Sequence, residues 1–285
     1  MIYAGASLLA DLEWLLQERE SFVCDEPLSG FLRQDWRACF ERLCADPTSL
    51  IAHMAAAKSH FLGTYFEQLF SFAVEHFTTL EVLAEHEQIQ TNGKTLGEVD
   101  LVVRDCNGRV LQFEIALKFY LERPDLFPNH WIGPNKNDSL AKKVSHARQH
   151  QLAILHTPAG QEWLQEASLS TAVQPNLMIY GRHFYTLSEQ ASAFFSLAKH
   201  HSAWLRCSQL LTLQGYLCDL QEANKPNWIT PATGESVTQQ ISATLLQTLA
   251  QRFDEDPRPV LFSCRHTDVD RQHEIFWLFV CPDNW

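Results

Sequence analysis

The sequence lacks the motifs by which several common classes of protein are recognised. No apolar run approaches the ~20 residues needed to cross a bilayer, and no basic leader precedes the first apolar residues. The eight cysteines form no C-x-x-C pair and share no metal-ligand spacing with the histidines. A glycine-rich phosphate loop and a G-x-S-x-G elbow are also absent. We therefore expect a cytoplasmic protein with reduced thiols, no membrane contact and no zinc, nucleoside-triphosphatase or serine-hydrolase site.

Positive charge is also scarce. The chain has 22 Lys and Arg residues against 34 Asp and Glu residues, which gives a formal net charge of -12. This balance argues against a broad basic surface that holds duplex DNA by neutralising phosphates. Any contact with nucleic acid must be local, whereas a cluster of carboxylates around a divalent metal would add to the negative total.

The composition otherwise predicts a globular chain with a sizeable core. Hydrophobic residues make up 46% and charged residues 20% of a 285-residue sequence, which exceeds the usual length of one compact domain. From Ala6 to about Phe77 the apolar residues recur at helical spacing, with breaks at Pro27, Asp35 and Asp46-Pro47. The last of these helices, residues 60–77, is apolar on most sides and should lie against the core.

The periodicity then changes to that of strands. Residues 79–90, 97–105 and 109–121 are β-rich runs separated by the segments TNGK and CNGR. Asn-Gly supplies the positive φ angles that tight hairpin turns require. The three runs therefore predict a three-stranded antiparallel meander.

A Pro- and Asn-rich loop at 123–137 follows, and Asp138 is placed to cap a helix over 138–155. A further strand is expected at 176–185. From about Ser188 the chain is expected to be helical, to pass through a loop at 225–235 and to end in strands at 259–266 and 274–281.

The order of helix, three strands, helix and strand predicts an α/β core with a mixed sheet flanked by helices. We expect an N-terminal helical segment at 1–60, the core at 61–187 and a C-terminal accessory α+β region at 188–285. The role of that last region is not indicated by the sequence.

Two acidic residues of the predicted sheet, Asp100 and Glu114, lie on neighbouring strands. Side chains alternate between the two faces of a strand. Asp100 and Glu114 therefore each lie on the polar face of their strand, whereas their neighbours in sequence lie on the apolar face. Charges buried in such a sheet cost several kcal/mol each unless they are paired or bind metal. Two facing carboxylates would repel, and a divalent cation removes that penalty. The pattern favours an oxygen-ligand site for Mg²⁺ or Mn²⁺, which takes one or two carboxylates with water and substrate phosphate.

This arrangement resembles the PD-(D/E)XK nuclease superfamily over residues 61–185. Members carry an Asp at the end of one hairpin strand and an acid followed by Lys on the next, and Asp100 in GEVDLVV and Glu114 in FEIALKF match those acids. The resemblance implies a restriction-endonuclease-like core, with Glu67 of the preceding helix in the place of a supporting metal-site glutamate. More closely, the segments GEVDLVV, FEIALKFYL, GPNKNDSLAKK, YGRHFY and KPNWITP look like an uncharacterised bacterial family known only as a domain of unknown function, itself assigned to this superfamily.

The chain departs from the superfamily pattern at the basic residue. Position 116, two residues after the acid, is Ala, and the nearest strand candidate is Lys118. Four strand residues separate Cα atoms by about 13 Å, so Lys118 is distant from the acid. In some members the following helix supplies the basic residue, a place that Lys142 or Lys143 takes here, with Gln149 or Gln151 nearby. Lys118 ranks slightly ahead of Lys142.

The resemblance implies a metal-dependent phosphodiesterase that acts on nucleic acid, with DNA the first expectation. Asp100 and Glu114 would bind the metal, Glu67 would support it, and Lys118 or Lys142 would assist the attacking water. The alternative is a catalytically inactive protein that keeps the fold as a nucleic-acid-binding or protein-interaction module, which Ala116 and the acidic total favour. A third possibility is a hydrolase for another phosphate-containing substrate.

Overall fold

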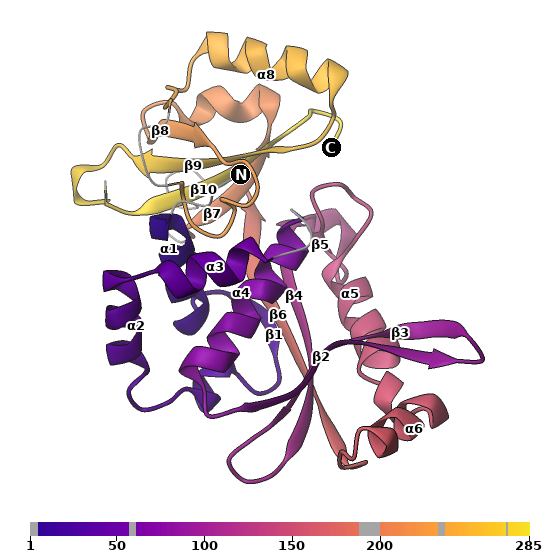
Figure 1. The fold of residues 1–285 in the computed structure, drawn as a ribbon. Helices are drawn as coiled ribbons and strands as arrows, with labels where there is room; N and C mark the ends of the chain where they lie inside the picture. Colours follow the sequence, from indigo (N-terminus) through magenta and orange to yellow (C-terminus); the bar gives the residue numbers. More distant parts are fainter. Residues whose placement is uncertain (1–4, 57–60, 188–199, 233–236, 272) are drawn as a thin grey trace. The chain divides into compact units, whose positions relative to one another are not determined.

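The protein is an α/β protein in which helices flank a mixed sheet (Figure 1). A computed structural model describes residues 5–56, 61–187, 200–232, 237–271 and 273–285 of the chain.

The chain divides into two compact units. Unit 1 comprises residues 1–118 and 142–181, and unit 2 comprises residues 119–141 and 182–285. Strands β4 (Val110–Glu122) and β6 (Val173–Thr186) each begin in unit 1 and end in unit 2.

The N-terminal part of unit 1 is mainly helical. In chain order its elements are α1 (Gly5–Leu16), β1 (Ser21–Cys24), the 3-10 turn η1 (Leu28–Phe31), α2 (Trp36–Ala45), α3 (Thr48–Ala55) and α4 (Leu62–Phe77). Helices α2 and α3 begin directly after Asp35 and Pro47, which confirms two of the predicted breaks. The helical prediction is wrong at β1, which pairs antiparallel with β6 through Ser21 and Tyr180. Local periodicity does not reveal such a strand, because its partner lies far along the chain.

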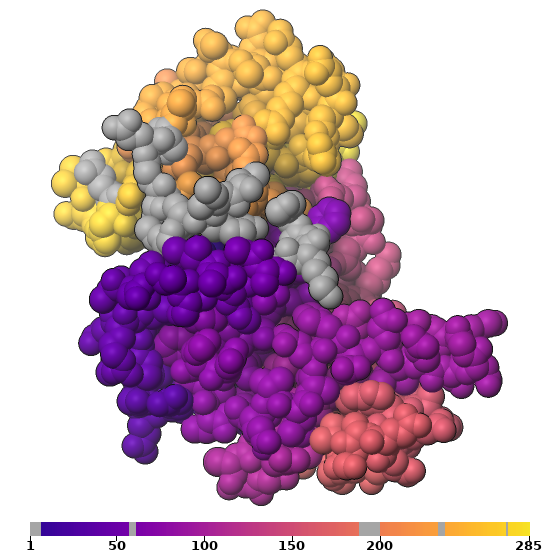
Figure 2. All heavy atoms as spheres, in the orientation of Figure 1, coloured from indigo at the N-terminus to yellow at the C-terminus, as the bar shows by residue number. Residues whose placement is uncertain are grey.

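The predicted meander is confirmed. Strands β2 (Glu81–Thr91), β3 (Lys94–Arg104) and β4 pair antiparallel in this order, and β6 follows β4 in the sheet. Asn92 and Gly93 have φ angles of 48° and 72°, as in the expected two-residue turn. Figure 2 shows the β2–β3 hairpin standing out from the rest of unit 1, on the right of the view.

The second turn differs in type from the expectation. Of its Asn-Gly pair only Gly108 has a positive φ, of 81°. The Gly108 N–H donates to the Asp105 carbonyl at 2.9 Å, and the Asp105 N–H donates to the Arg109 carbonyl at 3.0 Å. The reversal is therefore a longer loop in which glycine alone takes the left-handed conformation.

Helices cover both faces of the sheet in unit 1. On one face α4 packs Phe70 against Phe113 of β4, with ring centroids 6.3 Å apart, and Phe66 against Tyr180 of β6 at 5.5 Å. The other face is covered by the 3-10 turn η4 (Ile154–His156) and by α6 (Pro158–Glu166). Their buried residues form one cluster with apolar residues of the sheet: Ile89, Val99, Val102, Val110, Ile154, Leu155, Leu164 and Val173.

The helix predicted over 138–155 is shorter and interrupted. Helix α5 spans Leu140–His146, and a π-helical turn, η3, follows at Ala147–Gln151. Asp138 accepts a hydrogen bond from the Ser139 N–H at 2.8 Å, just before the helix begins. Helix α6 was not predicted, although Thr157 caps it by accepting the Gly160 N–H at 3.2 Å.

Unit 2 contains the remaining strands. Its further elements are η2 (Pro124–Leu126), β5 (Trp131–Ile132), β7 (Ser202–Arg206), η5 (Cys207–Leu213), β8 (Leu217–Glu222), α8 (Ala243–Glu255), β9 (Val260–His266), η6 (Val269–Arg271) and β10 (Ile275–Cys281). Strand β7 runs parallel to β6 and to β10, whereas β9 pairs antiparallel with β10 and β8.

The two closing strands are confirmed by β9 and β10. The helical expectation from Ser188 is wrong at β7 and β8, and its first part, residues 188–199, lies outside the described residues. Strand β7 has only five residues, four of them buried, so its sequence carries too few positions to show a period.

Candidate carboxylate site on strands β3 and β4

The candidate site begins where two strands of the meander separate. The pairing of β3 with β4 runs from Arg104 and Val110 to Leu101 and Phe113 and ends there. Asp100 is the next residue of β3, and its Oδ2 accepts the Ile115 N–H of β4 at 2.9 Å. The Asp100 carboxylate thus accepts the hydrogen bond that a backbone carbonyl of β3 would accept from Ile115 if the strand pairing continued.

Glu114 lies beside Asp100 and is buried. Its side chain is only 2% exposed, and its carboxyl group is hydrogen-bonded to that of Asp100. Lys143 of α5 reaches the same carboxyl group, with Nζ 2.7 Å from Oε1, and the Lys143 side chain is itself only 14% exposed. One ammonium group therefore faces two carboxyl groups.

The electrostatics of the pair follow from burial and mutual repulsion. Burial, followed by the negative charge of Asp100, raises the pKa of Glu114 from 4.5 to about 7, although Lys143 opposes the shift. Burial also raises the pKa of Asp100, against the Ile115 N–H and Lys143. The hydrogen bond between the two carboxyls raises the pKa of Glu114 and lowers that of Asp100, so the ionisation of each carboxyl depends on the state of the other.

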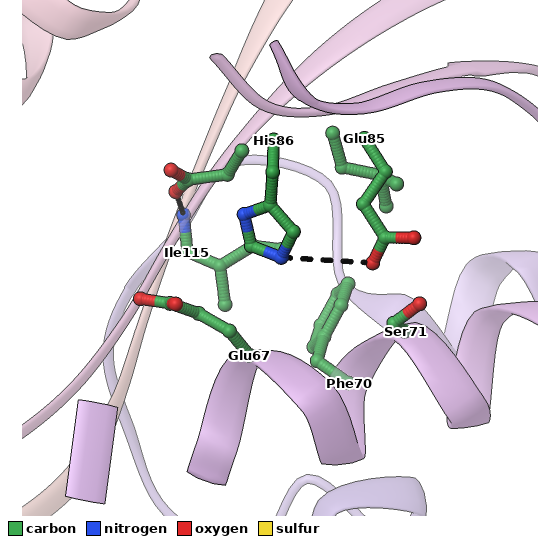
Figure 3. A pocket seen from close by; sticks show the side chains of 8 residues that line it. Glu67, Phe70, Ser71, Glu85, His86 and Ile115 are labelled. Carbon is green, nitrogen blue, oxygen red and sulfur yellow. Dashed lines mark hydrogen bonds and ion pairs between the residues drawn. The ribbon is translucent and has the colours of Figure 1, made fainter. Parts of the chain in front are cut away.

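Glu67 approaches the pair from α4. Figure 3 shows its side chain leaving the helix toward the strand that carries Ile115, in a small pocket lined also by Phe70, Ser71 and Asp100. Burial, followed by the charge of Asp100, raises the pKa of Glu67. The negative charge of Asp100 therefore raises the pKa of both other predicted acids, Glu67 and Glu114.

His86 is a site residue that the sequence did not indicate. Glu85 and Glu87 of β2 pair with Leu101 and Val99 of β3, so His86 lies opposite Asp100. It has a φ angle of 54°, an uncommon conformation for a strand residue. The imidazole Nδ1 is 3.2 Å from Oε1 of Glu98, and the ring lines the pocket of Figure 3.

The predicted basic residues take different positions. Lys143, which was named with Lys142 as a helix-borne candidate, contacts Glu114. Lys142 is exposed on the same helix, and Lys118 is half-buried on β4, four residues after Glu114. The catalytic roles assigned to Lys118 and Lys142 stay predictions, and the contact with Glu114 favours Lys143 of the two helix-borne candidates.

The carboxyl groups of Asp100 and Glu114 can supply two oxygen ligands to a cation. Within the described residues, no group of three or more His, Cys, Asp and Glu side chains is arranged to hold a metal ion. Asp100 and Glu114 nevertheless form an all-oxygen pair, and a divalent cation would compensate the negative charge of Asp100 that raises the pKa of Glu114. Mg²⁺ accepts such a pair because water and substrate phosphate fill its remaining positions.

These features define the class of the protein as α/β, with a mixed sheet and an acidic pair on its strands β3 and β4. The chain belongs to the family described as "Domain of unknown function (DUF1853)", whose model matches residues 5–280. This confirms the expected likeness to a family of unknown function, whereas membership of the PD-(D/E)XK superfamily stays a prediction.

The other comparisons add no relatives. No curated protein matches the chain, and no solved structure matches its fold. In the parts of the chain that the structure describes, no helix combines the length and apolar character required to cross a bilayer.

Proposed function

We propose that this protein is a metal-dependent nuclease that hydrolyses phosphodiester bonds in nucleic acid, with DNA as the first substrate to test. One observation carries the proposal. The carboxyl groups of Asp100 and Glu114 meet on adjacent strands, and the Lys143 ammonium lies 2.7 Å from one of them. Two acids can hold a metal that activates water, and a lysine in contact with them can stabilise the charge that develops on a phosphate.

Asp100 and Glu114 are the residues that would hold Mg²⁺ or Mn²⁺. The bound cation would activate water and neutralise the developing charge on the phosphate. The Ile115 N–H fixes one oxygen of Asp100, which orients the carboxylate before a ligand arrives. Glu67 would support the site through water, because its carboxyl is near Asp100 but, among the described residues, completes no group of three ligands.

Lys143 would act on the substrate side of the pair. Its ammonium neutralises the Glu114 carboxylate, and the same positive charge would stabilise the negative charge that builds up at phosphorus.

The test is cleavage of labelled single- and double-stranded DNA and RNA with Mg²⁺ or Mn²⁺, for the wild type and three variants. Asp100→Asn and Glu114→Gln should each reduce the rate by about 10²-fold or more, and Lys143→Met by about 10²-fold. Lys94→Met, which changes an exposed lysine at the start of β3, is the control and should stay within a few-fold of the wild type. Cleavage that survives both carboxylate substitutions would reject the proposal.

A second function is favoured by one feature of the chain. Ala116 stands where the superfamily places its strand lysine, which agrees with a nuclease-like fold that binds nucleic acid without cutting it. Metal-independent binding of an oligonucleotide, unchanged in Asp100→Asn and without any cleavage, would support this module in place of the nuclease.

A further inference from the structure

The helix that carries Lys143 contains one extra residue. Helix α5 ends at His146, and the chain continues in the π-helical turn η3, Ala147–Gln151. The Leu152 N–H donates to the Ala147 carbonyl, five residues back, at 2.8 Å. Single π-helical turns are rare and occur frequently at functional sites.

The extra residue changes which side chains share a face of the helix. Residues eight apart in an unbroken α-helix differ by about 80° around the axis, whereas residues seven apart differ by about 20°. Because the turn absorbs one residue, Gln151 takes the angular position of a residue seven places after Lys143. The two side chains consequently point in the same direction, toward β4.

Their contact is direct. Oε1 of Gln151 accepts a hydrogen bond from Nζ of Lys143 at 3.0 Å, and the same Nζ lies 2.7 Å from Oε1 of Glu114. The lysine ammonium is thus held between two oxygen atoms from different elements. A flexible four-carbon side chain with one such contact would keep more of its rotamers.

The turn is itself anchored to the strand of the acid. Nε2 of Gln112 donates to the backbone carbonyl of Gln151 at 2.9 Å, and the Gln112 side chain is only 1% exposed. Gln112 precedes Glu114 by two residues on β4, so both side chains lie on one face. This bond fixes the end of the π-helical turn relative to Glu114.

We propose that Gln151 is a positioning residue that sets the Lys143 ammonium on Glu114, and that the π-helical turn exists to place it there. The catalytic part of this inference rests on the proposed nuclease function. The positioning part does not, because it concerns only the location of an ammonium group in the free protein.

The first test measures the reactivity of Lys143 against that of its neighbour. The intact protein is treated with limiting acetic anhydride, and the ratio of Lys143 to Lys142 acetylation is read by mass spectrometry. Gln151→Leu should raise this ratio several-fold, whereas Gln151→Glu, which keeps an acceptor, should leave it near the wild-type value. Gln149→Leu, an exposed position of the same turn, is the matched control and should leave it unchanged.

A second variant guards against loss of folding. Gln151→Ala removes the side-chain acceptor but retains the backbone carbonyl that Gln112 binds, and it should raise the ratio in the same way. An unchanged ratio in folded Gln151→Leu or Gln151→Ala would overturn the positioning role, as would an equal rise in Gln149→Leu.

Measurements of cleavage distinguish the proposed nuclease function from the positioning role of Gln151. If the protein cleaves nucleic acid, Gln151→Leu should lower kcat about tenfold with little change in KM, and Gln151→Glu should restore most of it. A raised acetylation ratio without cleavage in any variant would reject the nuclease and keep the positioning role. A tenfold rise in KM at unchanged kcat would instead place Gln151 in substrate binding and overturn the inference.

Discussion

At the scale of single residues, the site is governed by one buried acid. Glu114 is 2% exposed, and Lys143 compensates its charge, while Asp100 opposes its ionisation. Its pKa is consequently raised to about 7. The folded protein therefore holds a proton on Glu114 over a pH range in which the unfolded chain has released it.

The raised pKa predicts a pH-dependent contribution to stability. Since the folded state binds more protons than the unfolded state between pH 4.5 and about 7, the stability that Glu114 contributes is present at acid pH and falls as the pH rises through this window. Relative to Glu114→Gln, the wild type should lose about 3 kcal/mol of unfolding free energy between pH 5 and pH 8. Urea unfolding of both proteins at the two pH values measures this, and an equal difference at both would contradict the raised pKa.

Lys143 should matter most when Glu114 is ionised. Removal of one partner of a buried ion pair leaves an uncompensated charge and costs about 3 kcal/mol or more. Lys143→Met should therefore destabilise the protein by about 3 kcal/mol at pH 8.5 and by about 1 kcal/mol at pH 5.5, where Glu114 is protonated. Denaturant unfolding tests this, with Lys142→Met as the exposed neighbouring control. A loss of equal size at both pH values would show that the ammonium contributes only by packing.

The acidic pair was predictable from the sequence, and its basic partner was not. Strand alternation placed Asp100 and Glu114 on polar faces of neighbouring strands, and the structure brings their carboxyls together. The choice among Lys118, Lys142 and Lys143 depends on the rotation of α5 about its axis and on the π-helical turn that follows it. Apolar periodicity predicts neither the rotation of α5 nor the π-helical turn, because the seven residues of α5 are too few to show a clear apolar face.

At the scale of elements, the hairpin segments were predicted best. The Asn92-Gly93 turn and three β-rich runs are local signals, and each corresponds to an observed turn or strand. Strands β1 and β7 were missed because each is short and pairs with a strand far along the chain, β1 with β6 and β7 with β10. A pairing partner that is remote in sequence does not affect the local periodicity. The formation of these strands therefore depends on tertiary structure and could not be predicted from the local sequence.

Strands β4 and β6 approach so closely at one point that only glycine fits. A Cβ on Gly181 would lie 1.6 Å from the carbonyl oxygen of Lys118, and Gly181 has a φ angle of 133°. Gly181→Ala should therefore cost about 3 kcal/mol or more of unfolding free energy. Gly30→Ala, at a position where a Cβ meets nothing within 4 Å, should change it by less than about 0.5 kcal/mol.

Thermal and urea unfolding of the two alanine variants, side by side, check this contrast. The two substitutions add the same methyl group, so a comparable loss in both would show that the close approach of the strands is not what requires glycine at position 181.

At the scale of the whole molecule, the candidate site lies within one compact unit. Glu67, Asp100, Glu114, Lys143 and Gln151 all belong to unit 1, although strand β4 continues into unit 2. The net charge of -12 gives no general attraction for nucleic acid. A polyanionic substrate would depend on local cations and on the metal itself, so metal binding is the step on which the account depends.

The most direct test is therefore calorimetric titration of the intact protein with Mn²⁺ at pH 7.5, without nucleic acid. One Mn²⁺ ion per chain should bind to the wild type and to Glu98→Gln, which changes an exposed acid on the same strand. Asp100→Asn and Glu114→Gln should each abolish or strongly weaken that binding. Absence of binding to the wild type, or equal binding to all four proteins, would contradict a metal site formed by Asp100 and Glu114.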